Sequence, residues 1–335
     1  MTLKVMVLSE DNREPGKGGG AESLMRDVTQ GLRARGHEVA WWFGEQPLME
    51  AIGKFKPDIC QMHTIHNKFG MQPAWYLQRH HIPHVWVLMD YWPFCQGRML
   101  LKNRQKESCA GINGLCDGDC DEGRAPELYL ETINRSPIVA LNPNTAAIYR
   151  RNGVKIAAII GCGIDTEFFK PDPIKREWGN VISTSAWPQY PTKGLAILRE
   201  AANRIKVNVG VITNVTRAEV RDALQTASIF VFPSTYEETW GLCLTEAMAT
   251  GLACIASNVC GPRAQVTDGE NGRLFINRNV DDLAGKLREL VDDPAEQERL
   301  GKNARLWVEQ NATLDIMAAK YERLYEAVLN GKSKS

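Results

Sequence analysis

Several features that would quickly narrow the function of this 335-residue chain are absent from it. It has no net charge, because 40 basic and 40 acidic side chains cancel, and this argues against a protein that coats nucleic acid or anionic lipid with its whole surface. It has no long apolar run near its start, where MTLKVMVLSE is too short for a signal peptide or a membrane span, so we expect a cytoplasmic protein. Its nine cysteines are an odd number, which argues against a complete disulfide framework.

The composition is that of a globular protein, with 44% apolar and 24% charged residues. The length exceeds what one hydrophobic core usually supports, which predicts two domains. Strand-like and helix-like patterns alternate in both halves, and this alternation predicts parallel sheets covered by helices on both faces. The expected strands cover residues 3–8, 37–43, 58–62, 84–89, 137–141, 180–184, 206–213, 228–232 and 252–257, with a proline-flanked linker at 168–179 and one long helical stretch at 296–329.

Two glutamates follow a predicted strand at the point where a helix begins, with Glu238 just before the helix and Glu246 inside it. Eight residues at about 1.5 Å per residue would separate the two carboxylates by roughly 12 Å. An acid/base pair acting on one glycosidic bond needs about 5 to 9.5 Å, so we expect the glutamates to hold the two ends of an extended ligand. The N–H groups of Trp240, Gly241 and Leu242 at the helix start would bind an anion between them. The alternative is that Glu238 is only a carboxylate stabilised by the helix dipole and that Glu246 is an exposed helix glutamate.

The stretch from Phe232 to Phe275, with EETWGLCLTEAMATGLACIASNVCGPRAQVTDGENGRLF, closely resembles the donor-binding signature of glycosyltransferase family 4, whose members are retaining enzymes with the GT-B fold. The resemblance implies that Glu238 contacts the transferred sugar and that Glu246 takes the ribose hydroxyls. It also implies that the backbone after Trp240 meets the diphosphate of the donor.

Other segments share the resemblance. GGGAESLMRDVTQGLRARGHEVAWW looks like the family's first glycine loop and helix, where Gly19 and Gly20 would let the backbone approach the donor diphosphate without a Cβ in the way. Lys193 looks like the lysine that neutralises the diphosphate leaving group, an interaction that is stronger in the transition state. The arginine usually found just upstream is absent from STSAWPQYPTKG. Taken singly, Gly19 and Gly20 could also belong to a flexible turn, and Lys193 could be a solvated lysine.

The first domain departs from the family where His-Asp often follows the fourth strand, because this chain has Met89-Asp90. All six histidines lie between His37 and His84, so a histidine at the reaction centre must come from this domain. His63, just past a strand end, and Asp90 are therefore candidate catalytic residues beside Glu238. Each could equally be a polar loop residue.

Four cysteines gather in one loop-like stretch between residues 91 and 125, namely Cys95, Cys109, Cys116 and Cys120. Four thiolates could close a tetrahedral structural zinc site, although the spacing is looser than in zinc ribbons. Buried or free thiols with one disulfide are the alternative. The Asp-Gly-Asp at 117–119 lies inside this loop, and we do not expect it to be catalytic because the diphosphate already has a helix terminus and a lysine.

The resemblance implies an α/β protein of GT-B architecture, with two Rossmann-like doubly wound parallel-sheet domains facing a central cleft. Residues 1–168 would form an acceptor-binding domain, residues 169–308 a donor-binding domain, and residues 309–335 a final helix that crosses back to the first domain. The expected reaction is transfer of a sugar from a nucleoside diphosphate sugar with retention of anomeric configuration and no cofactor. Trp92 and Trp240 could stack on sugar faces.

The sequence leaves the acceptor open among a glycan, a lipid-linked molecule, a small molecule and a nucleic acid, whose phosphates the segment 102–106 could contact. A nucleotide-sugar epimerase or hydrolase on the same fold is one alternative function. A sugar- or nucleic-acid-binding module without activity is another. The segment 211–228, where the base of the donor should be recognised, has no motif that identifies the base.

Overall fold

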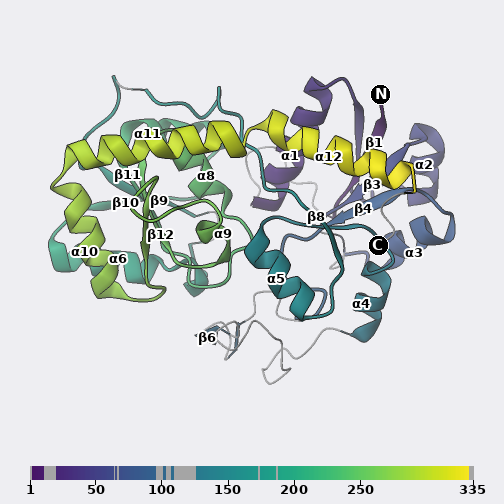
Figure 1. The fold of residues 1–335 in the computed structure, drawn as a ribbon, viewed down its shortest axis with the longest axis horizontal. Coiled ribbons are helices and arrows are strands. Elements are labelled where there is room, and N and C mark those ends of the chain that lie inside the picture. The colour runs from purple at the N-terminus through teal and green to yellow at the C-terminus, as the bar shows by residue number, and fades with distance from the viewer. Residues whose placement is uncertain are drawn as a thin grey trace. The chain divides into compact units, whose positions relative to one another are not determined.

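The computed structural model describes residues 2–10, 20–63, 65, 68–95, 101–102, 107–108, 126–172, 174–185 and 188–331. Within these residues the chain divides into two compact α/β units (Figure 1). Unit 1 takes in the described residues up to 10, those from 21 to 163 and those from 314 onward. Unit 2 takes in residue 20 and the described residues from 164 to 313.

Unit 1 contains a six-stranded sheet in the order β2-β1-β3-β4-β7-β8, with every pair of neighbours parallel. Its inner strands are mostly apolar and almost entirely buried, as a parallel sheet covered by helices requires. The elements of this unit are β1 (Lys4–Leu8), α1 (Gly20–Ala34), β2 (Glu38–Trp42), α2 (Leu48–Phe55), β3 (Ile59–Met62), α3 (Gln72–Arg79), β4 (His84–Val87), α4 (Glu127–Ile133), β7 (Ile138–Ala140), α5 (Pro143–Arg151) and β8 (Ile156–Ile159), with a separate antiparallel pair of β5 (Leu101–Lys102) and β6 (Glu107–Ser108).

Unit 2 contains a five-stranded parallel sheet in the order β10-β9-β11-β12-β13. Its core joins apolar side chains of the central strands, such as Val231 and Ile255, to those of α6 and α10, such as Leu198 and Leu287. The elements are β9 (Val181–Thr184), the 3₁₀ turn Pro191–Lys193, α6 (Leu195–Ile205), β10 (Val209–Ile212), α7 (Arg217–Thr226), β11 (Ile229–Phe232), α8 (Leu242–Ala249), β12 (Ala253–Ser257), α9 (Cys260–Arg263), β13 (Arg273–Phe275), α10 (Val280–Val291) and α11 (Pro294–Asn311).

The long helical stretch expected at 296–329 is wrong as a single helix. It consists of α11, which packs in unit 2, and α12 (Leu314–Leu329), which packs in unit 1. The break lies at Ala312 and Thr313, because the carbonyl of Ala312 accepts a hydrogen bond of 2.8 Å from the N–H of Ile164, and Thr313 forms an isolated β-bridge with the same residue. The segment 168–179, expected as a linker, packs within unit 2, where Phe169 is fully buried.

Within the described residues, no helix combines the length and the apolar character that crossing a bilayer requires.

Candidate functional site

The segment that leads from β11 into α8 is the centre of the candidate site. The helix begins at Leu242, and the residue before it, Gly241, has a φ of 95°, a left-handed conformation that favours glycine. The backbone N–H groups of Trp240, Gly241 and Leu242 donate no hydrogen bond to any described residue. Glu238 lies just before this helix start, as the sequence predicted. The helix therefore presents unpaired donors at its positive end, which suits an anion.

The loop before α8 is fixed from several sides. The N–H of Gly261 donates to the carbonyl of Glu238 at 2.8 Å, and the side-chain amide of Gln265 donates to the carbonyl of Trp240 at 2.7 Å. The indole N–H of Trp240 donates to Thr245 at 2.9 Å. A Cβ atom on Gly261 would lie only 2.2 Å from the carbonyl oxygen of Trp240, so only glycine fits there. These contacts pre-organise the N–H groups at the helix start.

Lys193 reaches the same loop from the end of the short 3₁₀ turn. Its ammonium lies 2.7 Å from Oε1 of Glu238 and 3.5 Å from the hydroxyl of Tyr236. The Tyr236 hydroxyl donates to the other carboxylate oxygen, and Ser234 donates to Oε1 at 3.2 Å. Burial alone would lower the pKa of Lys193, but the charge and hydrogen bond of Glu238 outweigh burial and raise it, so the ammonium stays charged.

The turn that carries Lys193 is itself docked on the loop. The residue after Lys193, Gly194, has a φ of 69°, and a Cβ on it would lie 1.8 Å from the carbonyl oxygen of Pro233. The carbonyl of Thr192 accepts a hydrogen bond of 2.8 Å from the N–H of Thr235. The structure thus brings the predicted site residues Lys193 and Glu238 into direct contact.

Glu246 lies in the middle of α8, a helix whose neighbouring side chains are almost all buried and apolar. Only 8% of the residue is exposed, which is unusual for a glutamate unless its charge is compensated. Oε1 of Glu246 lies 3.7 Å from Nε of Arg217, the first residue of α7. Sequence reasoning did not single out Arg217, because no motif marks it and only the fold brings α7 to α8.

Cys243, also on α8, interacts electrostatically with Lys193, Glu238 and Glu246. Sequence reasoning assigned it no role. Burial raises the pKa of Cys243 to about 12, and the charge of Glu246 adds to this effect. The thiol therefore stays protonated near neutral pH and is a polar wall of the site, not a nucleophile.

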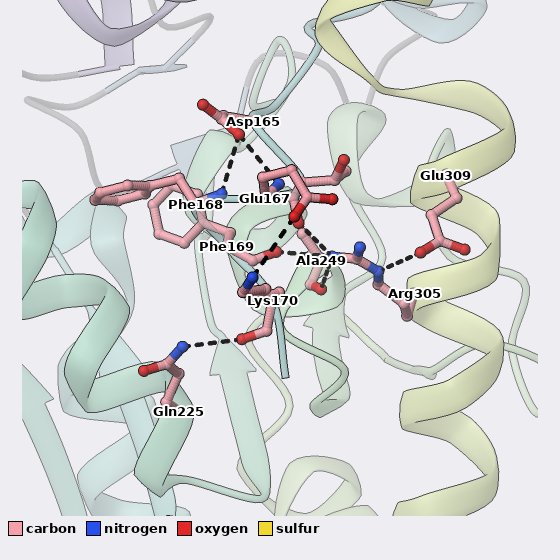
Figure 2. A network of polar contacts seen from close by, with 10 residues as sticks. Asp165, Glu167, Phe168, Phe169, Lys170, Gln225, Ala249, Arg305 and Glu309 are labelled. Carbon is pink, nitrogen blue, oxygen red and sulfur yellow. Dashed lines mark hydrogen bonds and ion pairs between the residues drawn. The ribbon is translucent and has the colours of Figure 1, made fainter. Parts of the chain in front are cut away.

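The other end of α8 is fixed by Arg305 of α11 (Figure 2). The Nη1 group of Arg305 donates to the carbonyl oxygens of Thr166, Phe169 and Ala249 at 3.0, 2.8 and 2.7 Å. Its Nε lies 2.5 Å from Oε1 of Glu309. A single guanidinium thus joins the last turn of α8 to the segment 165–170.

The two candidate catalytic residues of unit 1, His63 and Asp90, form hydrogen bonds with residues of that unit. His63 follows β3 and is 1% exposed, and its Nε2 lies 2.7 Å from the side-chain amide nitrogen of Gln61. That nitrogen is a donor, because the amide oxygen of Gln61 accepts from the Tyr325 hydroxyl, so Nε2 is an acceptor and the ring proton is on Nδ1. Burial lowers the pKa of His63 to about 3, and among the described residues Nδ1 has no hydrogen-bond partner. Asp90 accepts a hydrogen bond of 3.0 Å from the N–H of Trp92.

The tryptophans expected to stack on sugars are largely covered. Trp92 is 4% exposed and packs against the rings of Trp86 and Tyr129. Trp240 is 7% exposed. Stacking on a sugar would first require one of these rings to be uncovered.

Several sequence predictions lie outside the described residues, among them Gly19, the basic residues within 103–106, and the cysteines Cys109, Cys116 and Cys120. Gly20 is the first residue of α1, and Cys95 is 2% exposed. In the part of the chain that the structure describes, no three His, Cys, Asp or Glu side chains are grouped so that they could hold a metal ion. The four-cysteine zinc site stays a prediction.

Comparison with known proteins gives consistent matches. Residues 196–307 match the family described as "Glycosyl transferases group 1". The chain is 27% identical over 201 residues to an MMP alpha-(1->4)-mannosyltransferase of Mycolicibacterium hassiacum, covering 51% of this chain and 48% of the relative. It is 36% identical over 116 residues to a D-inositol 3-phosphate glycosyltransferase of Streptomyces bingchenggensis, covering 35% and 25%. The chain thus spans less than half the length of these curated relatives.

Solved structures match over nearly the whole chain. The sucrose-phosphate synthase of Thermosynechococcus elongatus superposes with a TM-score of 0.76 at 16% identity, covering 98% of this chain and all of the other. Anabaena Alr3699/HepE, solved in complex with UDP-glucose, superposes with a TM-score of 0.71 at 16% identity, covering 97% and 100%. At such identities the likeness shows the fold alone. Residues 196–307 are thus similar to the group 1 glycosyl transferases, and the two parallel-sheet units of the chain have the GT-B fold.

Proposed function

We propose that this chain transfers a sugar from a nucleoside diphosphate sugar to an acceptor hydroxyl, with unit 2 binding the donor and unit 1 the acceptor. The observation that carries the proposal is the start of α8. There, three N–H groups donate to no described residue, the charged Lys193 is paired with Glu238 just before the helix, and Glu246 lies within the helix. Diphosphates need such donors and a fixed cation, whereas the sugar and ribose diols need carboxylate acceptors.

The pairing of Lys193 with Glu238 supports an exchange of partners on binding. The charges of Lys193 and Glu238 neutralise each other across 2.7 Å. A diphosphate at the start of α8 offers the ammonium a more highly charged partner, and the carboxylate of Glu238 is then released to accept hydrogen bonds from the sugar. Glu246 would accept the ribose hydroxyls at the other end of the ligand.

The reaction breaks the bond between the anomeric carbon and the diphosphate oxygen, and the electron pair leaves with the diphosphate. Lys193 and the N–H groups at Trp240, Gly241 and Leu242 would stabilise the negative charge that grows there, an interaction stronger in the transition state than in the bound donor. The acceptor oxygen bonds to the anomeric carbon and passes its proton to the departing diphosphate oxygen. We propose retention of configuration, with Glu238 beside the reacting centre.

In unit 1, His63 suits donation of a hydrogen bond better than removal of a proton. Its ring is neutral, Nε2 is already an acceptor for Gln61, and Nδ1 carries the proton. We propose that His63 and Asp90 shape the acceptor side, and that neither is the general base.

The test is calorimetric binding of UDP, ADP, GDP and their glucose or mannose conjugates. Wild type should bind at least one of these ligands, and Lys193→Ala and Glu246→Ala should each weaken that binding by about tenfold or more. Lys302→Ala, which removes an exposed lysine of the same unit paired with Glu298, is the matched control and should bind normally. Equal affinities in all four proteins would contradict the site assignment, and free sugar or an epimer formed without acceptor would identify a hydrolase or an epimerase instead.

A further inference from the structure

The segment expected to recognise the donor base contains a partly buried cation, Arg217, that the sequence did not reveal. Thr216 and Glu219 form a capping box that fixes the first turn of α7. The guanidinium of Arg217 lies 5.0 Å from the ring centre of Phe169 and 5.6 Å from that of Phe168. Its side chain is only 14% exposed, and its Nε is 3.7 Å from a carboxylate oxygen of Glu246.

This arrangement fixes the orientation of the Arg217 guanidinium and pairs its positive charge with Glu246. A guanidinium packed against aromatic faces is held in one plane, and cation–π attraction adds to its stability when water is excluded. The partner carboxylate is 10% exposed at the side chain, so both charges have lost most of their hydration and each is tolerated because of the other.

The two aromatic rings are fixed by the same residue that fixes α8. The carboxylate of Asp165 accepts hydrogen bonds from the N–H groups of Glu167 and Phe168 at 3.1 and 3.0 Å, and Arg305 joins this segment to the last turn of α8 (Figure 2). The surface that carries Arg217 and the helix that carries Glu246 are therefore connected through one side chain. Their relative position is determined by unit 2 itself.

We infer that Arg217 is the positioning residue for Glu246. It keeps this carboxylate charged and turned so that both oxygens can accept the vicinal hydroxyls of a ribose, and it thereby makes the site selective for ribonucleoside over 2′-deoxyribonucleoside diphosphates. The inference rests on the proposed function and adds a discrimination that the proposed function does not require.

A matched control lies one helical turn further along α7. The guanidinium of Arg221 is 4.8 Å from the ring centre of Phe168, but its partner is the exposed Asp222. Arg221→Gln therefore removes a similar cation–π contact without affecting Glu246.

The experiment measures calorimetric affinities for a ribonucleoside diphosphate, chosen as the one of UDP, ADP and GDP that wild type binds most tightly, and for its 2′-deoxy analogue. Arg217→Gln should weaken binding of the ribonucleotide about tenfold or more, weaken the deoxy analogue much less, and bring the ratio of the two affinities close to one. Arg217→Lys should restore part of the ratio because it restores the charge. Arg221→Gln should leave both affinities unchanged.

If Arg217 only supported the fold, or contacted phosphate directly, Arg217→Gln would lower both affinities equally. The ratio of the two affinities would then be unchanged, and this result would overturn the inference. Thermal melting shows whether Arg217→Gln folds. If it does not, Arg217→Lys is measured instead, and a ratio of ribonucleotide to 2′-deoxy affinity equal to that of wild type overturns the inference. If Glu246→Gln loses the ribose preference while Arg217→Gln keeps it, the inference fails and the proposed function stands. If wild type binds none of the three nucleotides, both fail.

Discussion

The ammonium of Lys193 and the carboxylate of Glu238 form an ion pair of 2.7 Å beside the start of α8. Both residues were identified in the sequence as ligands of one donor molecule, and in the structure the two side chains contact each other. The ion pair holds both charges in place, and a bound diphosphate needs only to replace one partner of the lysine.

Removal of the lysine should affect turnover more than donor binding. In Lys193→Ala the N–H groups of α8 remain, but the cation that stabilises the departing diphosphate is lost, so kcat should fall by about a hundredfold or more. The KM for the donor should rise less. Steady-state kinetics on the donor identified by calorimetry measures both, and a rise in KM with unchanged kcat would mean that Lys193 contributes equally to ground state and transition state.

A single methyl group on Gly261 should displace the loop that precedes α8. Its Cβ would lie 2.2 Å from the carbonyl oxygen of Trp240, so Gly261→Ala must displace the loop before α8. We expect a loss of about 1–3 kcal/mol in the free energy of unfolding, together with weaker nucleotide binding. Gly285→Ala in the interior of α10 is the control, because its Cβ would meet nothing within 4 Å, and it should stabilise the protein by about 0.5–1 kcal/mol. Urea unfolding of both variants measures the difference, and a neutral Gly261→Ala would show that the loop is not rigid.

The burial of His63 should make stability depend on pH. Its folded-state pKa, about 3, lies below the ordinary value of 6.5, so between these values the unfolded chain binds a proton that the folded chain does not. Stability should therefore decline as pH falls from 6.5 toward 3, by at most about 1.4 kcal/mol per pH unit from this residue. Urea unfolding of His63→Asn should show a shallower decline than wild type. His80→Asn, at an exposed position, should follow wild type. A slope for His63→Asn equal to that of wild type would contradict the buried neutral ring.

Loss of Arg305 should destabilise unit 2. Arg305→Met would leave the carbonyls of Thr166, Phe169 and Ala249 without this donor. We expect a loss of about 2–4 kcal/mol in the free energy of unfolding. Lys302→Met, one turn earlier on α11 and exposed, should change it by less than about 1 kcal/mol. Equal effects of the two substitutions would show that the Arg305 network is not a significant support.

Much of the fold could be predicted because the inner strands are mostly apolar. Nine strands were predicted within a few residues of their observed bounds. The short edge strands β8 and β13 were missed, since β13 has only 3 residues and β8, although apolar, alternates in burial. The break between α11 and α12 was missed because neither Ala312 nor Thr313 is a helix breaker, and the break depends on a hydrogen bond from Ile164, nearly 150 residues away.

The candidate site was predictable only where residues are close in sequence. Glu238 and Glu246 surround one helix start and could be identified together. Arg217 could not, because its partners Phe168, Phe169 and Glu246 come from other parts of the chain and meet it only through the sheet topology.

A crystal structure with a bound nucleoside diphosphate sugar would show whether the donor diphosphate binds at the start of α8. We expect phosphate oxygens within hydrogen-bond distance of the N–H groups of Gly241 and Leu242, with the ammonium of Lys193 turned from Glu238 to the phosphate. A ligand bound elsewhere, with the pair of Lys193 and Glu238 intact, would contradict this expectation.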